Sequence, residues 1–164
     1  MGDVLEQANS PSSAIEHLLR DRLGHRMDRY AFPPPVFAAM EGQFLELDLD
    51  AGFLTAQFPV LESYLNPYHT MQGGMIAAAV DNTLGPLSVL VAPPNVTRQL
   101  EMTYSRPVTF DMGHIVVTAR FLERSGRRLF FRADVHSQDG LRLARSKAVH
   151  WVVDERDVRR TNTA

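Results

Sequence analysis

The sequence predicts an α+β fold in which an antiparallel β-sheet wraps around one central α-helix. Two observations carry this prediction. Six segments alternate in character with the period of a β-strand, and one long apolar segment with helical periodicity stands between the second and the third of them. Strands joined by tight turns favour antiparallel pairing, and an apolar helix needs a sheet face to cover it. A single sheet curved around the helix satisfies both requirements.

A short helix is expected near the N-terminus, from Ser10 to Gly24. Ser10 or Ser12 can cap its start, and Gly24 can end it. Its apolar positions recur at helical spacing, at Ile15, Leu18, Leu19 and Leu23. Three consecutive prolines at 33–35 then forbid a regular helix or a ladder strand, so the chain is expected to cross to the next element in an extended form. Residues 1–42 are thus predicted to be an N-terminal helix and a connector.

The period changes to two from Phe44 onward, which predicts a half-buried strand. One side of this strand carries Leu45, Leu47 and Leu49, and the other carries Glu46, Asp48 and Asp50. Ala51-Gly52 turns the chain, and Phe53 to Val60 is expected to complete a hairpin with the first strand.

The central helix is expected from Gly73 to about Val91. Gly85-Pro86 should kink or shorten it, because proline lacks a backbone donor and clashes with the preceding turn. Pro93-Pro94-Asn95 closes the segment.

Four further strands are expected after the helix. They span Val96 to Tyr104, Ile115 to Leu122, Leu129 to His136, and Leu141 to Val152, with turn residues at 111–113, 125–126 and 139–140 between them. In the first, one face carries Val96, Leu100, Met102 and Tyr104, and the other carries Thr97, Gln99, Glu101 and Thr103. The sheet and helix are predicted to form one domain over 43–153, followed by a charged, frayed tail over 154–164.

The composition limits the classes of function. A net charge of -2 over 164 residues gives no overall electrostatic reason to expect nucleic acid or an anionic membrane as partner. The chain has no cysteine, which excludes disulfides and thiolate chemistry, and the histidines show no metal-ligand spacing, so no metal is proposed. The N-terminus lacks the pattern of a signal peptide, and no run reaches the roughly 18 apolar residues of a membrane span, so a cytoplasmic protein is expected.

One stretch, NPYHTMQGGMIAAAVDN from Asn66 to Asn82, joins a polar turn to the apolar helix. Together with VTRQLEMTYSRPV, it resembles the hotdog-fold acyl-CoA thioesterases, in particular the branch that includes phenylacetyl-CoA thioesterase. The resemblance covers about residues 43–153. It depends on an Asn, two glycines at the start of the central helix and an Asp eight residues beyond the first glycine. Asn66, Gly73, Gly74 and Asp81 occupy these positions.

The chain departs from the family pattern at two positions. Gln72 stands where the family has a histidine, and His69 stands where a glycine is usual. Other hotdog thioesterases use glutamine as an amide that orients the carbonyl, so Gln72 either donates to the substrate carbonyl or caps the helix. His69 either replaces the missing imidazole or is an exposed loop histidine.

Thioester hydrolysis needs a stabilised carbonyl oxygen and a group that delivers water or attacks the carbonyl carbon. The N–H groups of Gly73 or Gly74 suit the first task, because they are unpaired donors at the positive end of the helix dipole; alternatively, the two glycines only make a tight turn. Asp81 suits the second, as general base or as nucleophile, since a carboxylate among apolar residues is unfavourable unless it is paired or functional. The alternative is that the Asp81 carboxylate faces solvent, or that Asp81 and Asn82 together form hydrogen bonds to a neighbouring strand.

Helix geometry separates these two groups. Gly73 and Asp81 are eight residues apart, or about 12 Å along the axis, which is too far for both to contact one carbonyl. Two antiparallel helices about a twofold axis would bring Gly73 of one subunit near Asp81 of the other. The resemblance implies this arrangement, with two composite sites in a dimer or in a dimer of dimers.

The resemblance assigns roles to further residues. Thr97 would hold the attacking water beside Asp81, and Asn66 would brace the loop or Gln72; the alternatives are a threonine chosen for β propensity and ordinary turn chemistry before proline. The arginines of the ERSGRRLFF hairpin would bind the phosphates of coenzyme A, unless they are only a solvated surface. They are Arg124, Arg127 and Arg128.

The predicted function is therefore hydrolysis of an acyl-CoA to a free acid and coenzyme A by a homo-oligomer that needs no dissociable cofactor. A non-catalytic protein that binds or senses acyl-CoA is the alternative, suggested by Gln72 in place of histidine. A hydratase acting on acyl thioesters is disfavoured, because the chain lacks the paired His and acidic residue of those enzymes.

Overall fold

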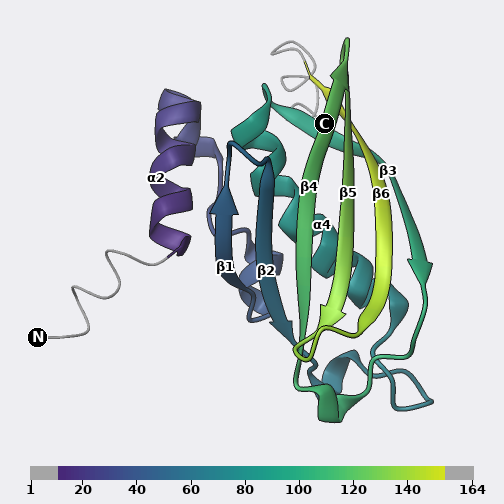
Figure 1. Ribbon diagram of the computed structural model, residues 1–164. Helices are drawn as coiled ribbons and strands as arrows, with labels where there is room; N and C mark the ends of the chain where they lie inside the picture. Colours follow the sequence, from purple (N-terminus) through teal and green to yellow (C-terminus); the bar gives the residue numbers. More distant parts are fainter. Residues whose placement is uncertain (1–10, 154–164) are drawn as a thin grey trace, which may run out of the picture.

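The computed structural model describes residues 11–153, so the predicted Ser10 cap and the charged tail lie outside the described residues. Within this range six strands form one antiparallel sheet in the order β1-β2-β4-β5-β6-β3, and the helix α4 (Gly73–Val91) lies along one face of it (Figure 1). The strands are β1 (Gln43–Asp48), β2 (Phe53–Pro59), β3 (Asn95–Tyr104), β4 (His114–Ser125), β5 (Arg128–Ser137) and β6 (Arg142–Val152). The predicted α+β fold is confirmed.

The N-terminal helix α2 (Pro11–Leu23) packs against α4 and the edge strand β1 (Figure 1). Its buried face carries Ile15, Leu19 and Leu23, whereas Leu18 is 36% exposed. A 3₁₀ segment, η1 (Gly24–Arg29), follows it. The prediction that prolines 33–35 exclude a helix is wrong, because the short helix α3 (Pro35–Ala39) begins at the last of them. Proline is tolerated at the first helical position, where its missing N–H would have no intrahelical acceptor.

A bulge changes the buried face of β1. The pairing with β2 shifts between Phe44 and Glu46, so Leu45 is the extra residue. Phe44 is buried and stacks on Phe37 with ring centroids 4.2 Å apart. The predicted face of Leu45, Leu47 and Leu49 is therefore wrong, since Leu45 is 41% exposed and Leu49 is 39% exposed. An inserted residue moves later side chains to the opposite face.

A second bulge lies in β3 and has more bearing on the site. The pairing with β6 shifts between Thr97 and Gln99, which leaves Arg98 as the extra residue. Thr97 pairs with the buried His150, and after the bulge Leu100 pairs with the buried Ala148. Thr97 therefore shares the inner face with Leu100, not with Gln99. The predicted division of this strand into two faces is wrong on this point.

The helix α4 forms the centre of the core. Ten of its residues are buried, and Val80, Leu84 and Leu87 are among those with no exposed surface. It continues through Pro86, so the proline does not shorten it. Its length and mean hydropathy of 1.4 would also suit a membrane span, but 56% of that window is buried within the fold, as expected for a core helix.

One edge strand of the sheet is covered by a helix, and the other edge strand is exposed. The helix α2 lies against β1 at one edge, whereas β3 at the other edge has β6 as its only partner strand among the described residues. Most side chains of β3 are exposed along its ten residues. A long exposed edge of this kind offers unpaired backbone groups to a further strand.

Candidate active site

The structure brings Asp81 of α4 and Thr97 of β3 together. The Thr97 hydroxyl donates to Asp81 Oδ1 over 3.0 Å, and both residues are exposed at the uncovered edge of the sheet. Asp81 thus has solvent access and a hydrogen bond to a neighbouring strand. Asn82 takes no part in this contact, because its amide donates to the Ala78 carbonyl at 2.9 Å. A carboxylate that is hydrogen-bonded yet open to solvent can accept a proton from a water molecule.

Sequence reasoning missed two residues that extend this contact inward. Thr97 Oγ1 also lies 3.3 Å from Nε2 of His150, whose Nδ1 lies 2.9 Å from Oδ1 of Asn95. His150 is only 1% exposed, and its ring packs on Phe131 with centroids 4.8 Å apart. The signal that could have found it is its phase in β6, since His150 continues the buried alternation of small residues at 144, 146 and 148.

The surroundings of His150 favour its neutral form. Burial lowers the pKa of the imidazole below its ordinary value, and the charge of Asp81 opposes part of this shift. A neutral imidazole has one N–H donor and one acceptor nitrogen, so it can donate a hydrogen bond to one of Thr97 and Asn95 and accept one from the other.

The other half of the predicted site lies at the start of α4. Gly73 and Gly74 are the first two helical residues, and their N–H groups have no intrahelical acceptor. The Tyr104 hydroxyl donates to the Gly73 carbonyl at 2.7 Å, and a Cβ built on Gly73 would lie 3.1 Å from the Tyr104 ring. A side chain at position 73 would therefore crowd the Tyr104 ring, which would have to move by a few tenths of an ångström. Burial raises the pKa of Tyr104 above its ordinary value.

Gln72 precedes these glycines with an exposed side chain and does not cap the helix through it. Of the two predicted uses of Gln72, helix capping is thus wrong. A pocket of about 420 Å³ opens beside the helix start, and Gly73, Tyr104 and Arg106 are among its lining residues. The amide of Gln72 is available to a molecule that approaches the first N–H groups of α4.

Asn66 braces the loop that leads into the helix. Its Oδ1 accepts from the backbone N–H groups of Tyr68 and Thr70, at 2.9 and 3.3 Å, and its amide donates to the Thr70 hydroxyl at 2.9 Å. The side chain therefore holds the loop in shape, as an Asn before proline commonly does. The side chain of His69 is exposed, and its backbone is in the left-handed conformation, with φ of 58°.

The three arginines of the β4–β5 hairpin are exposed, and the two strands that carry the hairpin are the middle strands of the sheet. Arg124 Nε donates to a carbonyl of the same turn at 2.9 Å, and Arg127 Nε donates to a carbonyl at the end of β6 at 3.0 Å. Arg128 pairs with Trp151, which pairs with Val96, the residue before Thr97. The hairpin therefore lies at the end of the sheet where β3 begins, away from the helix start, and Arg128 is on the outer face, two strands from Thr97.

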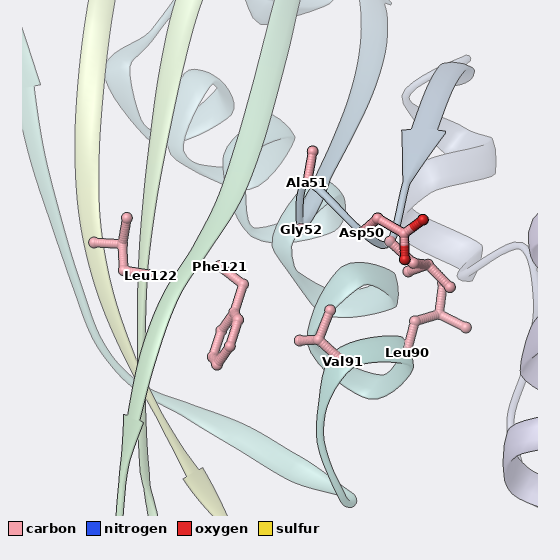
Figure 2. A pocket seen from close by; sticks show the side chains of 8 residues that line it. Asp50, Ala51, Gly52, Leu90, Val91, Phe121 and Leu122 are labelled. Atoms are coloured by element: carbon pink, nitrogen blue, oxygen red, sulfur yellow. The ribbon is translucent and has the colours of Figure 1, made fainter.

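A second pocket, of about 460 Å³, lies at the far end of α4 (Figure 2). Leu90 and Val91 of the helix, Phe121 and Leu122 of β4, and Asp50 are among its lining residues. None of the predicted site residues lines this pocket.

Comparison with known proteins agrees with this description. Residues 68–144 match the family model of the thioesterase superfamily. No curated protein matches the chain. Among solved structures, a phenylacetic acid degradation-related protein from Ralstonia eutropha JMP134 is similar, with 28% identity and a TM-score of 0.68 over 78% of this chain and 98% of that one.

Two more distant structures share the fold. The E. coli PaaI protein from the phenylacetic acid degradation operon has 15% identity and a TM-score of 0.70, over 85% of this chain and 96% of its own. A Streptococcus mutans UA159 protein bound to acetyl CoA has 18% identity and a TM-score of 0.67, over 76% of this chain and 96% of its own. The resemblance to the hotdog-fold thioesterases is confirmed.

Proposed function

We propose that this protein, with its hotdog fold and the thioesterase superfamily pattern in residues 68–144, hydrolyses an acyl-CoA to a free acid and coenzyme A. The observation that carries the proposal is the contact between Asp81 and Thr97, at the position where the family resemblance expects the reacting carboxylate. The structure of the Streptococcus mutans neighbour bound to acetyl CoA supports an acyl-CoA as the substrate class.

In the proposed reaction Asp81 acts as general base. It removes one proton from a water molecule as the water oxygen attacks the thioester carbonyl carbon, which gives a tetrahedral intermediate with a negatively charged oxygen. When the intermediate collapses, the C–S bond breaks, and the sulfur of coenzyme A leaves with the proton that Asp81 held. The products are the carboxylic acid and the thiol, and Asp81 returns to its ionised form.

The carbonyl oxygen would be stabilised at the start of a helix α4. The N–H groups of Gly73 and Gly74 point out of the helix at the positive end of its dipole, and the Gln72 amide stands beside them. Because Gly73 and Asp81 are about 12 Å apart along one helix, we propose that these donors come from a second copy of the chain. The exposed edge strand β3 supports this assignment, because its unpaired backbone groups offer a second copy a strand to pair with.

Coenzyme A would be held at the β4–β5 hairpin. Three arginines are exposed there, Arg124, Arg127 and Arg128. Guanidinium groups bind phosphate oxygens through bidentate hydrogen bonds. The hairpin lies at the end of the sheet where β3 begins, and the nucleotide would lie outside the fold there.

The experiment is acyl-CoA hydrolysis by wild type and by Asp81→Asn, followed with a thiol-detecting reagent over short, aromatic and long acyl chains. The amide keeps the size of the side chain but cannot take up the proton, so kcat should fall by about 100-fold or more. Asp50→Asn, an exposed carboxylate at the other pocket, is the matched control and should leave kcat unchanged.

Near wild-type turnover by a folded Asp81→Asn protein would remove Asp81 from the reaction. The absence of thiol release from every acyl-CoA, together with saturable binding of the same compounds, would instead favour a protein that binds or senses acyl-CoA. The replacement of the family histidine by Gln72 motivates that second function.

A further inference from the structure

We propose that His150 is a positioning residue for this reaction, whose Nε2 atom accepts the hydroxyl hydrogen of Thr97 while Asp81 removes a proton from water. The inference deepens the proposed function and rests on it. Its basis is a continuous row of hydrogen-bond partners that runs from the exposed Asp81 through Thr97 and His150 to Asn95.

Asn95 fixes the tautomer of the imidazole. Its side-chain NH₂ donates to the backbone carbonyls of Ser88 and Pro93, at 3.1 and 2.9 Å, which uses both amide hydrogens. Oδ1 of Asn95 therefore faces His150 Nδ1, and because an amide oxygen can only accept, Nδ1 must carry a hydrogen. In the neutral ring Nε2 is then an acceptor, and it faces Thr97.

Thr97 has one hydroxyl hydrogen and two acceptors within reach. Asp81 Oδ1 lies 3.0 Å from Thr97 Oγ1, and His150 Nε2 lies 3.3 Å from it. The hydroxyl can donate to only one of them at a time, so it has two orientations. The bulge at Arg98 is what gives Thr97 this choice, because it sets Thr97 on the inner face beside His150.

The two orientations differ in what they offer to water. When Thr97 donates to Asp81, its hydrogen occupies a lone pair of Asp81 Oδ1 that a water molecule would otherwise use. When Thr97 donates to His150, Asp81 loses that hydrogen bond, and the Thr97 oxygen can accept from the second hydrogen of the attacking water. No covalent bond changes at Thr97 or His150; only the hydroxyl rotates. The second orientation therefore favours attack.

The charges around His150 allow this role at neutral pH. Asp81 on α4 is the charged group that acts on the ring, while its neighbours on β3, Asn95 and Thr97, and on β5, Leu129 and Phe131, are uncharged. Burial lowers the pKa of His150, so the ring is neutral at pH 7. At lower pH Nε2 gains a proton, ceases to be an acceptor, and Thr97 is held in the donating orientation toward Asp81.

The kinetic test compares His150→Gln with His150→Phe. Gln can place a non-titrating acceptor near the Nε2 position and should retain most of kcat at pH 7, whereas Phe has no acceptor and should lose about tenfold in kcat with little change in KM. In a Thr97→Val background the Phe substitution should cost nothing further. An equal loss in both backgrounds would show that His150 does not act through Thr97 and would overturn the proposal.

The pH dependence gives a second readout. The ratio of kcat for wild type to kcat for His150→Gln cancels the titration of groups that both proteins share. It should fall as the pH drops through the pKa of His150, which nitrogen-detected NMR of the ring measures directly. A ratio that stays constant across that titration would contradict the role of His150.

The NMR spectrum also separates this inference from the proposed function, because it needs no substrate. At pH 7 the His150 ring should be neutral with hydrogen on Nδ1, and Thr97→Val should shift the Nε2 resonance. Hydrogen on Nε2 at pH 7 would overturn the proposal even in an active enzyme. The predicted tautomer in a protein that hydrolyses no acyl-CoA would instead refute the proposed function and, with it, a role for His150 in that reaction.

Discussion

Two inactive variants of this protein are expected to restore activity when their chains are mixed. One is Asp81→Ala, and the other is the double variant Asn66→Ala, Gln72→Ala. The reason is the geometry of α4, on which Gly73 and Asp81 are separated by about 12 Å. Reacting groups must lie about 3–3.5 Å apart. One carbonyl therefore cannot meet both ends of the same helix, and the two parts of a site must come from different subunits.

The expected recovery follows from the symmetry of a dimer. In a mixed dimer one site combines both defects, and the other site contains neither. Random re-pairing of equal amounts makes about half of the dimers mixed, each with one intact site of two, so about a quarter of wild-type activity should return. Sites built within single chains would recover nothing, since every chain carries one defect.

The assay needs three controls. Each variant alone must be folded and inactive, and differently tagged chains must show by pull-down that mixed dimers form after reversible dissociation. Asp50→Ala removes a carboxylate at the other pocket. This variant should be active alone and should therefore show no complementation. Verified mixed dimers without recovered thioester hydrolysis would refute the shared site.

Two further predictions concern the hairpin and the core. Replacing Arg127 and Arg128 together by Ala should raise KM for acyl-CoA about tenfold with a smaller effect on kcat. The rise in KM should shrink for a pantetheine thioester, which lacks the nucleotide phosphates. Equal losses for both substrates would argue against this phosphate site. Ser146 Oγ is the one buried side-chain polar atom without a hydrogen-bond partner in the described part of the chain, so Ser146→Ala should leave the free energy of unfolding unchanged or raise it by about 1 kcal/mol in urea denaturation. Ser137→Ala is the matched control, since that buried hydroxyl bonds Asp139 and the Leu141 backbone, and it should lose about 1 kcal/mol; equal losses for the two serines would contradict the reasoning.

Local periodicity was sufficient to predict much of the fold. The helix from Gly73 to Val91 matches its predicted bounds, because a long apolar run that begins with two glycines and is followed by prolines is typical of one helix with defined ends. The strands were also predicted, with ends that differ by a few residues. These features depend on neighbours in sequence, and the chain displays them directly.

Part of the candidate site followed in the same way. The spacing of Gly73 and Asp81 on one helix is fixed by the sequence and by the rise per residue. The family resemblance then pointed to Thr97 as the partner of Asp81, and the structure brings the two side chains into contact. It did not point to Asn95, which precedes Thr97 on the same strand, or to His150, which only the pairing of β6 with β3 sets beside Thr97.

The sequence by itself determined the elements, the helix start and the carboxylate, whereas the tertiary structure decided which side chains face one another. The alternation of β3 reads as unbroken, so Thr97 was expected on the face opposite Leu100. The bulge at Arg98 reverses that relation, and it exists only in the pairing of β3 with β6. Because side chains alternate with a period of two, one unpaired residue is enough to turn Thr97 inward, toward His150 and within reach of Asp81.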